Sequence, residues 1–184
     1  MIIPALDVER RHSRVLEQPL AAPRTGLMLH YDDSSRDDWA VAWFEDPRCT
    51  NGYTWLVLDD GRVIELADPA FRTPHAGACK TPRANSSFYG VAAATNGQVL
   101  ATEAQLASIA RVCVAVSRFH GWLADSIASR IVGHDREAIW TPAYTRIPEL
   151  WGRVGRKLDP TGIRLDDRPI IDLKDITQRI QHLL

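Results

Sequence analysis

The chain has 184 residues, a length that suits one ordinary domain better than two, so we expect a single domain over residues 1–184. Hydrophobic residues make up 45% of the chain and charged residues 24%, values that are typical of a globular protein and exclude a disordered or fibrous one. The formal net charge of −1 provides no basic excess for a phosphate backbone, which argues against nucleic acid as a partner.

The amino-terminal segment, MIIPALDVERRHSR, reaches charged residues before any apolar stretch is long enough for a secretory signal. No later segment approaches the ~20 apolar residues that a membrane-spanning helix needs. We therefore expect a protein that is made in the cytoplasm without a signal peptide and does not insert into a membrane. We also expect a monomer. The cysteines Cys49, Cys79 and Cys113 are widely spaced and are expected to be free thiols, with Cys113 in the core.

The first regular segment is the apolar run at 27–31, LMLHY, which predicts a strand with a histidine near its end. A helix is expected next, in the segment that opens with SSRDDW, where Ser34 or Ser35 would cap the first turn. Trp39 and Trp43 lie four residues apart, so we expect both indole rings on the face of this helix that packs on the core.

Strand patterns return in later segments of the chain. Residues 53–66, YTWLVLDDGRVIEL, are two β-type runs around Asp60 and Gly61, a pair that favours a hairpin turn. The segment FYGVAAAT at 88–95 predicts another strand. The segment RIVGH at 130–134 predicts a buried strand that again ends at a histidine.

Two helices are marked by their ends and by their apolar spacing. Thr102 and Gln105 match a capping box at the start of the first helix, and Gly121 follows its end. Its apolar residues repeat at helical spacing: Leu106, Ile109, Ala110, Cys113 and Val116. The second helix is expected over about 172–184. Because strands and helices alternate, we expect an α/β fold with a central mixed β-sheet flanked by helices.

His30 and His134 differ from the other histidines because each follows an apolar run, which would place both imidazoles at strand ends on a rigid frame. A catalytic zinc ion takes three protein ligands of the His, carboxylate or thiolate type and keeps a fourth position for water. Asp159 in GRKLDP is the candidate third ligand. The residues alone leave a second interpretation open, because a histidine at a strand end is commonly structural and an aspartate before proline is commonly a turn residue.

Six segments resemble, in the same order, the type 2 N-acetylmuramoyl-L-alanine amidase family, which includes amidase-type phage lysozymes and peptidoglycan recognition proteins. These segments are LMLHY, NGYTWLVLDDGRVIEL, HAG, NSSFYGVAAAT, IVGH and GRKLDP. The resemblance implies a zinc-dependent enzyme that hydrolyses the amide bond between N-acetylmuramic acid and the first L-alanine of the stem peptide. It also implies a zinc site at strand ends in a surface groove, with bacterial peptidoglycan as the partner and a motif-bearing core over about residues 27–160.

The same resemblance implies which residues form the site. His30, His134 and Asp159 would hold Zn²⁺, and Tyr53 and Lys157 occupy positions where the phage-lysozyme branch has functional residues. Hydrogen-bond donors and positive charge stabilise the tetrahedral oxyanion that forms during amide hydrolysis. Tyr53 and Lys157 are therefore the expected catalytic residues.

One position departs from the family pattern. Many members carry a glutamate as general base in the strand that corresponds to YGVAA, and Ala92 stands at that position here. The departure favours the variant of the site that uses Tyr53 and Lys157, and it leaves the proton donor open. His75 in PHAGA is a candidate for a contact with the substrate or for support of a metal ligand, and an ordinary loop histidine is the alternative. Asn85, which precedes the strand at 88–95, is a candidate for a contact with the substrate.

The predicted function is a cell-wall lytic amidase, and the expected setting is a phage or prophage endolysin that reaches the wall through a holin or another non-classical route. An internal recycling enzyme is the alternative setting, although Ala92 fits that branch less well. Three other functions stay open: a peptidoglycan-binding module without catalysis, a zinc peptidase that cuts within the stem peptide, and a regulator that binds another protein.

Overall fold

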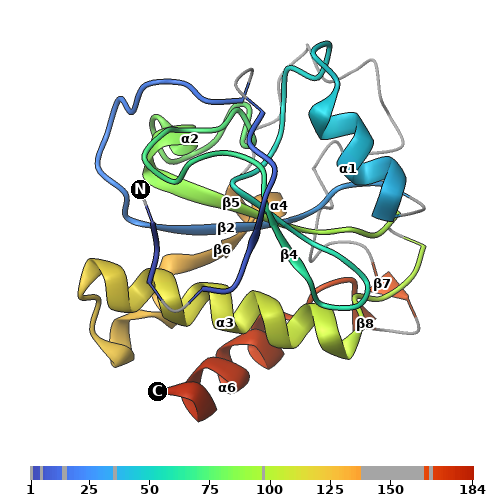
Figure 1. Cartoon of the computed structure of the whole chain (residues 1–184). Helices are drawn as coiled ribbons and strands as arrows, with labels where there is room; N and C mark the ends of the chain where they lie inside the picture. The colour runs from blue at the N-terminus through green and yellow to red at the C-terminus, as the bar shows by residue number, and fades with distance from the viewer. Residues whose placement is uncertain are drawn as a thin grey trace.

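The computed structural model describes residues 2–4, 6–13, 16–34, 37–96, 98–137, 164–165 and 168–184. Within these residues a six-stranded sheet has the strand order β1-β4-β3-β5-β2-β6 (Figure 1). Its strands are β1 (Glu9–Arg10), β2 (Gly26–Tyr31), β3 (Trp55–Val57), β4 (Val63–Glu65), β5 (Phe88–Ala93) and β6 (Ile131–Gly133). β3 and β4 pair antiparallel and the other neighbours pair parallel, so the expected mixed sheet is confirmed.

The helices lie on both faces of this sheet (Figure 1). They are α1 (Asp37–Glu45), α2 (Ala84–Ser87), α3 (Glu103–His120), α4 (His134–Glu137) and α6 (Leu173–Leu183), with short 3₁₀ turns at Ala124–Ser126 and Ala128–Arg130. A separate two-stranded sheet pairs β7 (Arg164–Leu165) with β8 (Arg168–Pro169). No described helix is long and apolar enough to cross a membrane.

The sheet separates two apolar layers. On one face, Leu27, Leu29 and Tyr31 of β2 pack in a cluster with the buried sides of α3 and α6. On the other face, Met28 packs with Ala84 of α2. Because successive side chains of a strand point to opposite faces, His30 shares the face of Met28. The candidate metal ligand in β2 is therefore directed away from α3 and α6.

Helix α3 has the ends that its sequence predicts. The Thr102 side chain accepts a hydrogen bond from the Gln105 backbone N–H, and the Gln105 side chain accepts one from the Thr102 backbone N–H, so the capping box is complete. Gly121 follows the helix with a φ of 64°, a left-handed conformation that glycine adopts without steric cost. Cys113 is fully buried in the core, and all three cysteines are free thiols, as expected.

The predicted packing of helix α1 is wrong. Trp39 and Trp43 are 58% and 48% exposed, and the buried residues of this helix are Ala40 and Phe44. These two residues are also four positions apart, so the helix is rotated by one residue from the expected phase. The Phe44 ring packs edge-on against the ring of Tyr53, with centroids 5.5 Å apart, and this contact orients α1 on the sheet.

The hairpin and the last two predicted elements are confirmed with small shifts. Gly61 has a φ of 86° in the turn between β3 and β4. The strand predicted at 130–134 is β6, Ile131–Gly133, and the histidine that follows it begins helix α4. Asp172 caps α6 by accepting a hydrogen bond from the Lys174 backbone N–H at 2.8 Å.

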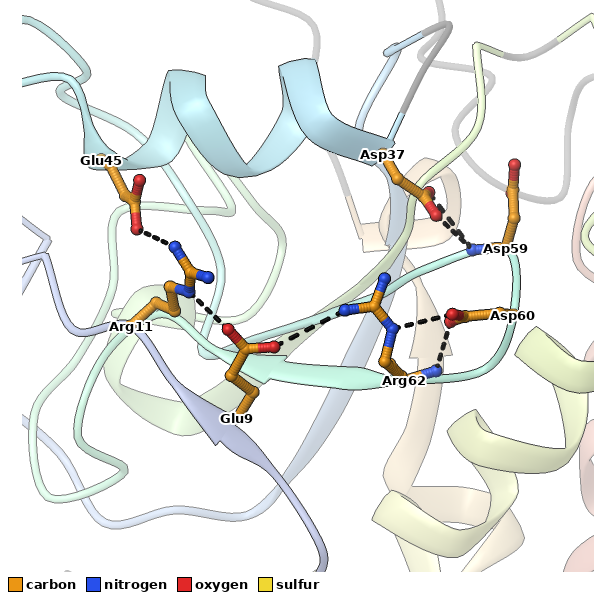
Figure 2. Close-up of polar contacts among 7 residues, drawn as sticks. All are labelled: Glu9, Arg11, Asp37, Glu45, Asp59, Asp60 and Arg62. Atoms are coloured by element: carbon orange, nitrogen blue, oxygen red, sulfur yellow. Dashed lines mark hydrogen bonds and ion pairs between the residues drawn. The ribbon is translucent and has the colours of Figure 1, made fainter.

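Ion pairs connect β1 to the hairpin and to helix α1 (Figure 2). Glu9 of β1 lies between two arginines, with Arg11 Nε at 2.6 Å from one carboxylate oxygen and Arg62 Nη1 at 3.6 Å from the other. Arg11 also contacts Glu45 at the end of α1, at 3.0 Å. All four side chains are substantially exposed to solvent, so each pair contributes little stability.

Candidate metal centre

The two candidate histidine ligands meet where β2 and β6 end. These strands are parallel neighbours, and the last paired residues are Leu29 and Gly133. His30 is the next residue of β2, and His134 directly follows β6 as the first residue of α4, so the register brings them side by side. Both side chains are buried, with exposed fractions of 1% and 4%, and their Nδ1 atoms lie 3.0 Å apart.

The Nε2 atoms of His30 and His134 both point at the loop that contains His75 and Ala76, and this loop in turn contacts β5. His134 Nε2 lies 2.7 Å from the Ala76 carbonyl oxygen. His30 Nε2 lies 3.1 Å from Nδ1 of His75, whose own Nε2 lies 3.2 Å from the Phe88 carbonyl oxygen. The three histidines and two carbonyl groups thus form one connected set of buried polar contacts.

These contacts determine the tautomers, because a carbonyl oxygen only accepts hydrogen bonds. His75 must donate from Nε2 to the Phe88 carbonyl. Burial and the neighbouring His30 lower the pKa of His75 well below its usual value, so this ring is neutral and its Nδ1 is an acceptor. His30 must then donate from Nε2, and His134 must donate from Nε2 to the Ala76 carbonyl. In the neutral form of each of these two rings, Nδ1 carries a lone pair.

The two Nδ1 atoms fit a zinc ion as a pair of ligands. With a zinc–nitrogen distance of 2.0–2.1 Å and tetrahedral angles, two ligand nitrogens lie roughly 3.3 Å apart. The separation of 3.0 Å between His30 and His134 is close to that value. Among the described residues no group of three or more His, Cys, Asp or Glu side chains is arranged to hold a metal. The predicted third ligand, Asp159, lies outside the described residues, as does Lys157.

Tyr53 lies against the first histidine. Its ring centroid is 4.9 Å from that of His30, and its hydroxyl donates a hydrogen bond of 3.3 Å to the Tyr31 carbonyl oxygen. A typical O–H···O hydrogen bond is about 2.7–2.8 Å long, so this one is weak. Tyr53 is therefore beside the candidate metal site.

Asn85 contacts the loop that contains His75 and Ala76. Its Oδ1 accepts hydrogen bonds from the backbone N–H groups of His75 and Ala76, at 2.9 and 2.7 Å. His75 is 7% exposed, and both of its ring nitrogens contact other groups of the chain. Contact of His75 and Asn85 with substrate, which the sequence suggests, stays a prediction.

Comparison with known protein families shows which family the chain belongs to. A model of the N-acetylmuramoyl-L-alanine amidase family matches residues 20–162, which span both histidines and most of the chain. The chain belongs to this family. The resemblance seen in its sequence motifs is thereby confirmed, and family membership supports peptidoglycan amidase activity. No curated protein sequence matches the amidase in a direct comparison.

Solved structures of similar fold cover most of the amidase. A selenomethionine derivative of AmpD has a TM-score of 0.68 at 17% identity, over 98% of this chain and 99% of that one. A mutant endolysin from Bacillus subtilis has a TM-score of 0.51 at 13% identity, over 70% and 85%. AmiD from E. coli, solved with an anhydro-N-acetylmuramic acid peptide, has a TM-score of 0.53 at 17% identity, over 68% and 55%. At these identities the likeness shows the fold.

The amidase has a methyl group where many members of the family carry a glutamate. Ala92 of β5 is the register partner of His30 on the adjacent parallel strand, so both side chains emerge on the same face. Ala92 is fully buried beside Leu56 and Phe44 in an apolar cluster. No general base is available at this position, and a proton carrier has to come from another residue or from water.

Asp32, which follows β2, gives the amidase a pH-dependent stability that can be measured. Its Oδ1 accepts hydrogen bonds from the backbone N–H groups of Ser34 and Thr95, whereas its buried Oδ2 accepts none from the described residues. Burial raises the pKa of Asp32 to about 6, although these hydrogen bonds oppose the rise. The folded protein therefore binds this proton more tightly than the unfolded chain does. Ionising Asp32 lowers stability as the pH rises through about 6.

We expect Asp32→Asn to raise the free energy of unfolding at pH 8 by on the order of 2 kcal/mol and to have little effect at pH 4. The amide keeps the Oδ1 acceptor and removes the buried charge. Urea unfolding of the metal-free protein between pH 4 and 8 measures the effect. Asp46→Asn is the control of opposite sign, because Arg48 lowers the pKa of that carboxyl to about 2, so the substitution should not raise stability at pH 8. A variant at position 32 that loses stability at pH 8 would contradict the assignment of a buried charge.

Proposed function

We propose that this amidase hydrolyses, with zinc, the amide bond between N-acetylmuramic acid and the first L-alanine of the peptidoglycan stem peptide. Family membership supports the amidase activity on peptidoglycan. The zinc dependence rests on one observation, the two histidine Nδ1 atoms that lie 3.0 Å apart in tautomers that leave a lone pair on each. A cation between them would be bound by both.

The substrate is proposed from the family and from one relative. The E. coli AmiD structure contains anhydro-N-acetylmuramic acid linked to L-Ala-D-γ-Glu-L-Lys, which includes the lactyl-to-alanine amide. Peptidoglycan is accordingly the partner that we propose for this chain. The expected setting, a phage or prophage endolysin, and the expected monomeric state stay predictions.

The proposed roles of His30, His134 and Tyr53 rest on their positions, and those of Asp159 and Lys157 rest on the resemblance of the sequence to the family. His30 and His134 would hold the zinc ion through Nδ1, and Asp159 would be the third ligand. Bound zinc would act as a Lewis acid towards the amide carbonyl and would lower the pKa of a water molecule from about 15.7 towards about 7. Tyr53 and Lys157 would stabilise the developing oxyanion by donating hydrogen bonds. Proton transfer to the leaving nitrogen would involve Tyr53 or water, since Ala92 has no titratable group.

The test is release of new amino-terminal L-alanine from purified cell wall. The full chain should release it, a chelator should stop the release, and added Zn²⁺ should restore it. Mass spectrometry of the soluble products should find intact stem peptides that begin with L-alanine. Wall binding without a new amine would instead indicate a non-catalytic binding module, and peptides cut within the stem would indicate a zinc peptidase. Release that persists after complete metal removal would overturn the zinc-dependent mechanism.

A further inference from the structure

We propose that the loop at His75 and Ala76, clamped by Asn85, is the outer shell of the metal centre and fixes the ring orientation of both histidine ligands. This inference rests on the proposed function, because it concerns the zinc site of that reaction. It assigns positioning roles to Ala76 and Asn85, for which the sequence suggested no such role, and it specifies the atoms through which His75 would support a ligand. Neither His75 nor Asn85 needs to touch the metal or the substrate for this role.

The loop holds His30 through a side chain. His75 Nδ1 lies 3.1 Å from His30 Nε2, and the Phe88 carbonyl at 3.2 Å from His75 Nε2 fixes which nitrogen donates. Arg24 donates a hydrogen bond to the same Phe88 carbonyl oxygen and so holds the acceptor in place. The result is a one-way chain of donors, from His30 to His75 to Phe88. Its effect is to leave Nδ1 of His30 as the metal-binding atom.

The loop holds His134 through its backbone. The Ala76 carbonyl oxygen lies 2.7 Å from His134 Nε2, which is a good hydrogen-bond distance. His75 and Ala76 are adjacent, so a single short segment provides the acceptor for each ligand ring. Any movement of this segment would disturb both Nδ1 atoms together. An imidazole that donates its second N–H in this way is a more basic and better oriented metal ligand.

Two features hold the loop itself. Asn85 Oδ1 accepts the backbone N–H of His75 at 2.9 Å and that of Ala76 at 2.7 Å, so one side-chain atom fixes both residues. Gly90 of β5 provides the surface on which the His75 ring packs. A Cβ atom at Gly90 would lie 2.8 Å from His75 Cγ, closer than real contacts allow, so only glycine leaves room for this ring.

The experiment measures metal affinity without relying on activity. Metal-free full-length protein is titrated with Co²⁺, whose visible absorption reports both the dissociation constant and the coordination geometry. We expect His75→Ala and Asn85→Ala to weaken Co²⁺ binding by roughly 10-fold to 100-fold and to change the spectrum. Asn85→Asp keeps an oxygen acceptor at the same place and should bind Co²⁺ much more tightly than Asn85→Ala.

A glycine substitution tests the link between Gly90 and the metal through His75. Gly90→Ala should weaken Co²⁺ binding in the wild-type background, because the added methyl displaces the His75 ring. The same change should have little further effect in His75→Ala, where no ring is present to be displaced. Additive effects of the two substitutions would show that Gly90→Ala disturbs the site by another route.

The control and the outcomes separate this inference from the proposed function. His120→Ala removes a buried contact of 2.9 Å with the Tyr89 hydroxyl on the other side of the sheet and should leave the Co²⁺ affinity unchanged. Circular dichroism checks that each variant is folded. If His75→Ala does not fold, the Co²⁺ affinities of Gly90→Ala, Asn85→Ala and Asn85→Asp still test the inference.

The outcomes distinguish the two proposals. If wild type binds no Co²⁺, the proposed function fails. If wild type binds it and the folded loop variants bind it equally well with the same spectrum, only the outer-shell inference fails.

Discussion

His30→Ala and His134→Ala should each abolish zinc retention and amidase activity together. Each substitution removes one of the two nitrogen atoms that lie 3.0 Å apart, and a catalytic zinc ion has only three protein ligands. The remaining histidine would keep its Nε2 contact but could not hold the ion alone. The measurements are zinc content after gel filtration, by atomic absorption, and release of amino-terminal L-alanine from purified cell wall.

Two further variants complete this experiment, one at the predicted third ligand and one as a matched control. Asp159→Ala should have the same effect as the histidine substitutions, and an active, zinc-containing Asp159 variant would mean that another residue is the third ligand. His120→Ala is the control, because it also removes a partly buried imidazole but lies at the end of α3. Zinc retained by a folded His30 or His134 variant would show that these Nδ1 atoms do not bind the metal.

The elements that position the histidines were predictable because their signals are local. The apolar runs that became β2 and β5, the Asp60-Gly61 hairpin and the capping box of α3 each depend on neighbouring residues. Both histidines could be singled out for the same reason, since each follows an apolar run. Their meeting also required that β2 and β6 be neighbours in the sheet. That fact is not local, and it comes from the strand pairing in the structure. The family resemblance implied only that both histidines hold zinc.

The parts that were missed depend on long-range packing or on backbone atoms. Trp39 and Trp43 share a helical face, but so do Ala40 and Phe44. The second face is the buried one because it packs in the apolar cluster that contains Leu56 of β3. The Ala76 carbonyl contact with His134 leaves no trace in residue type, because every residue has a carbonyl group. A glycine at position 90 was the one available signal of close packing, and its neighbour in space could not be read from the sequence.

The position of Tyr53 gives a reason to expect a specific catalytic role for its hydroxyl. The hydroxyl donates a long hydrogen bond of 3.3 Å to the carbonyl of Tyr31, the residue next to His30. An oxyanion at the metal site would accept a stronger, charge-assisted hydrogen bond from this hydroxyl than the Tyr31 carbonyl does. The ring is held independently of the hydroxyl, by Phe44 at 5.5 Å and His30 at 4.9 Å between centroids. Removing the hydroxyl should therefore leave the site intact.

Tyr53→Phe should lower kcat by roughly 100-fold to 1,000-fold, which is the usual effect of removing one oxyanion donor, while KM and zinc content stay near the wild-type values. Steady-state hydrolysis of a soluble muramoyl peptide, with zinc analysis of the same samples, measures both quantities. Tyr89→Phe is the matched control, since its hydroxyl contacts His120 and Arg24 and neither of the two histidine ligands, so kcat should change far less. An unchanged kcat in Tyr53→Phe would exclude a role for this hydroxyl in the chemical step. A loss of zinc would instead show that Tyr53 supports His30 structurally. The kcat decrease at constant zinc content is therefore the result that assigns the hydroxyl to the oxyanion.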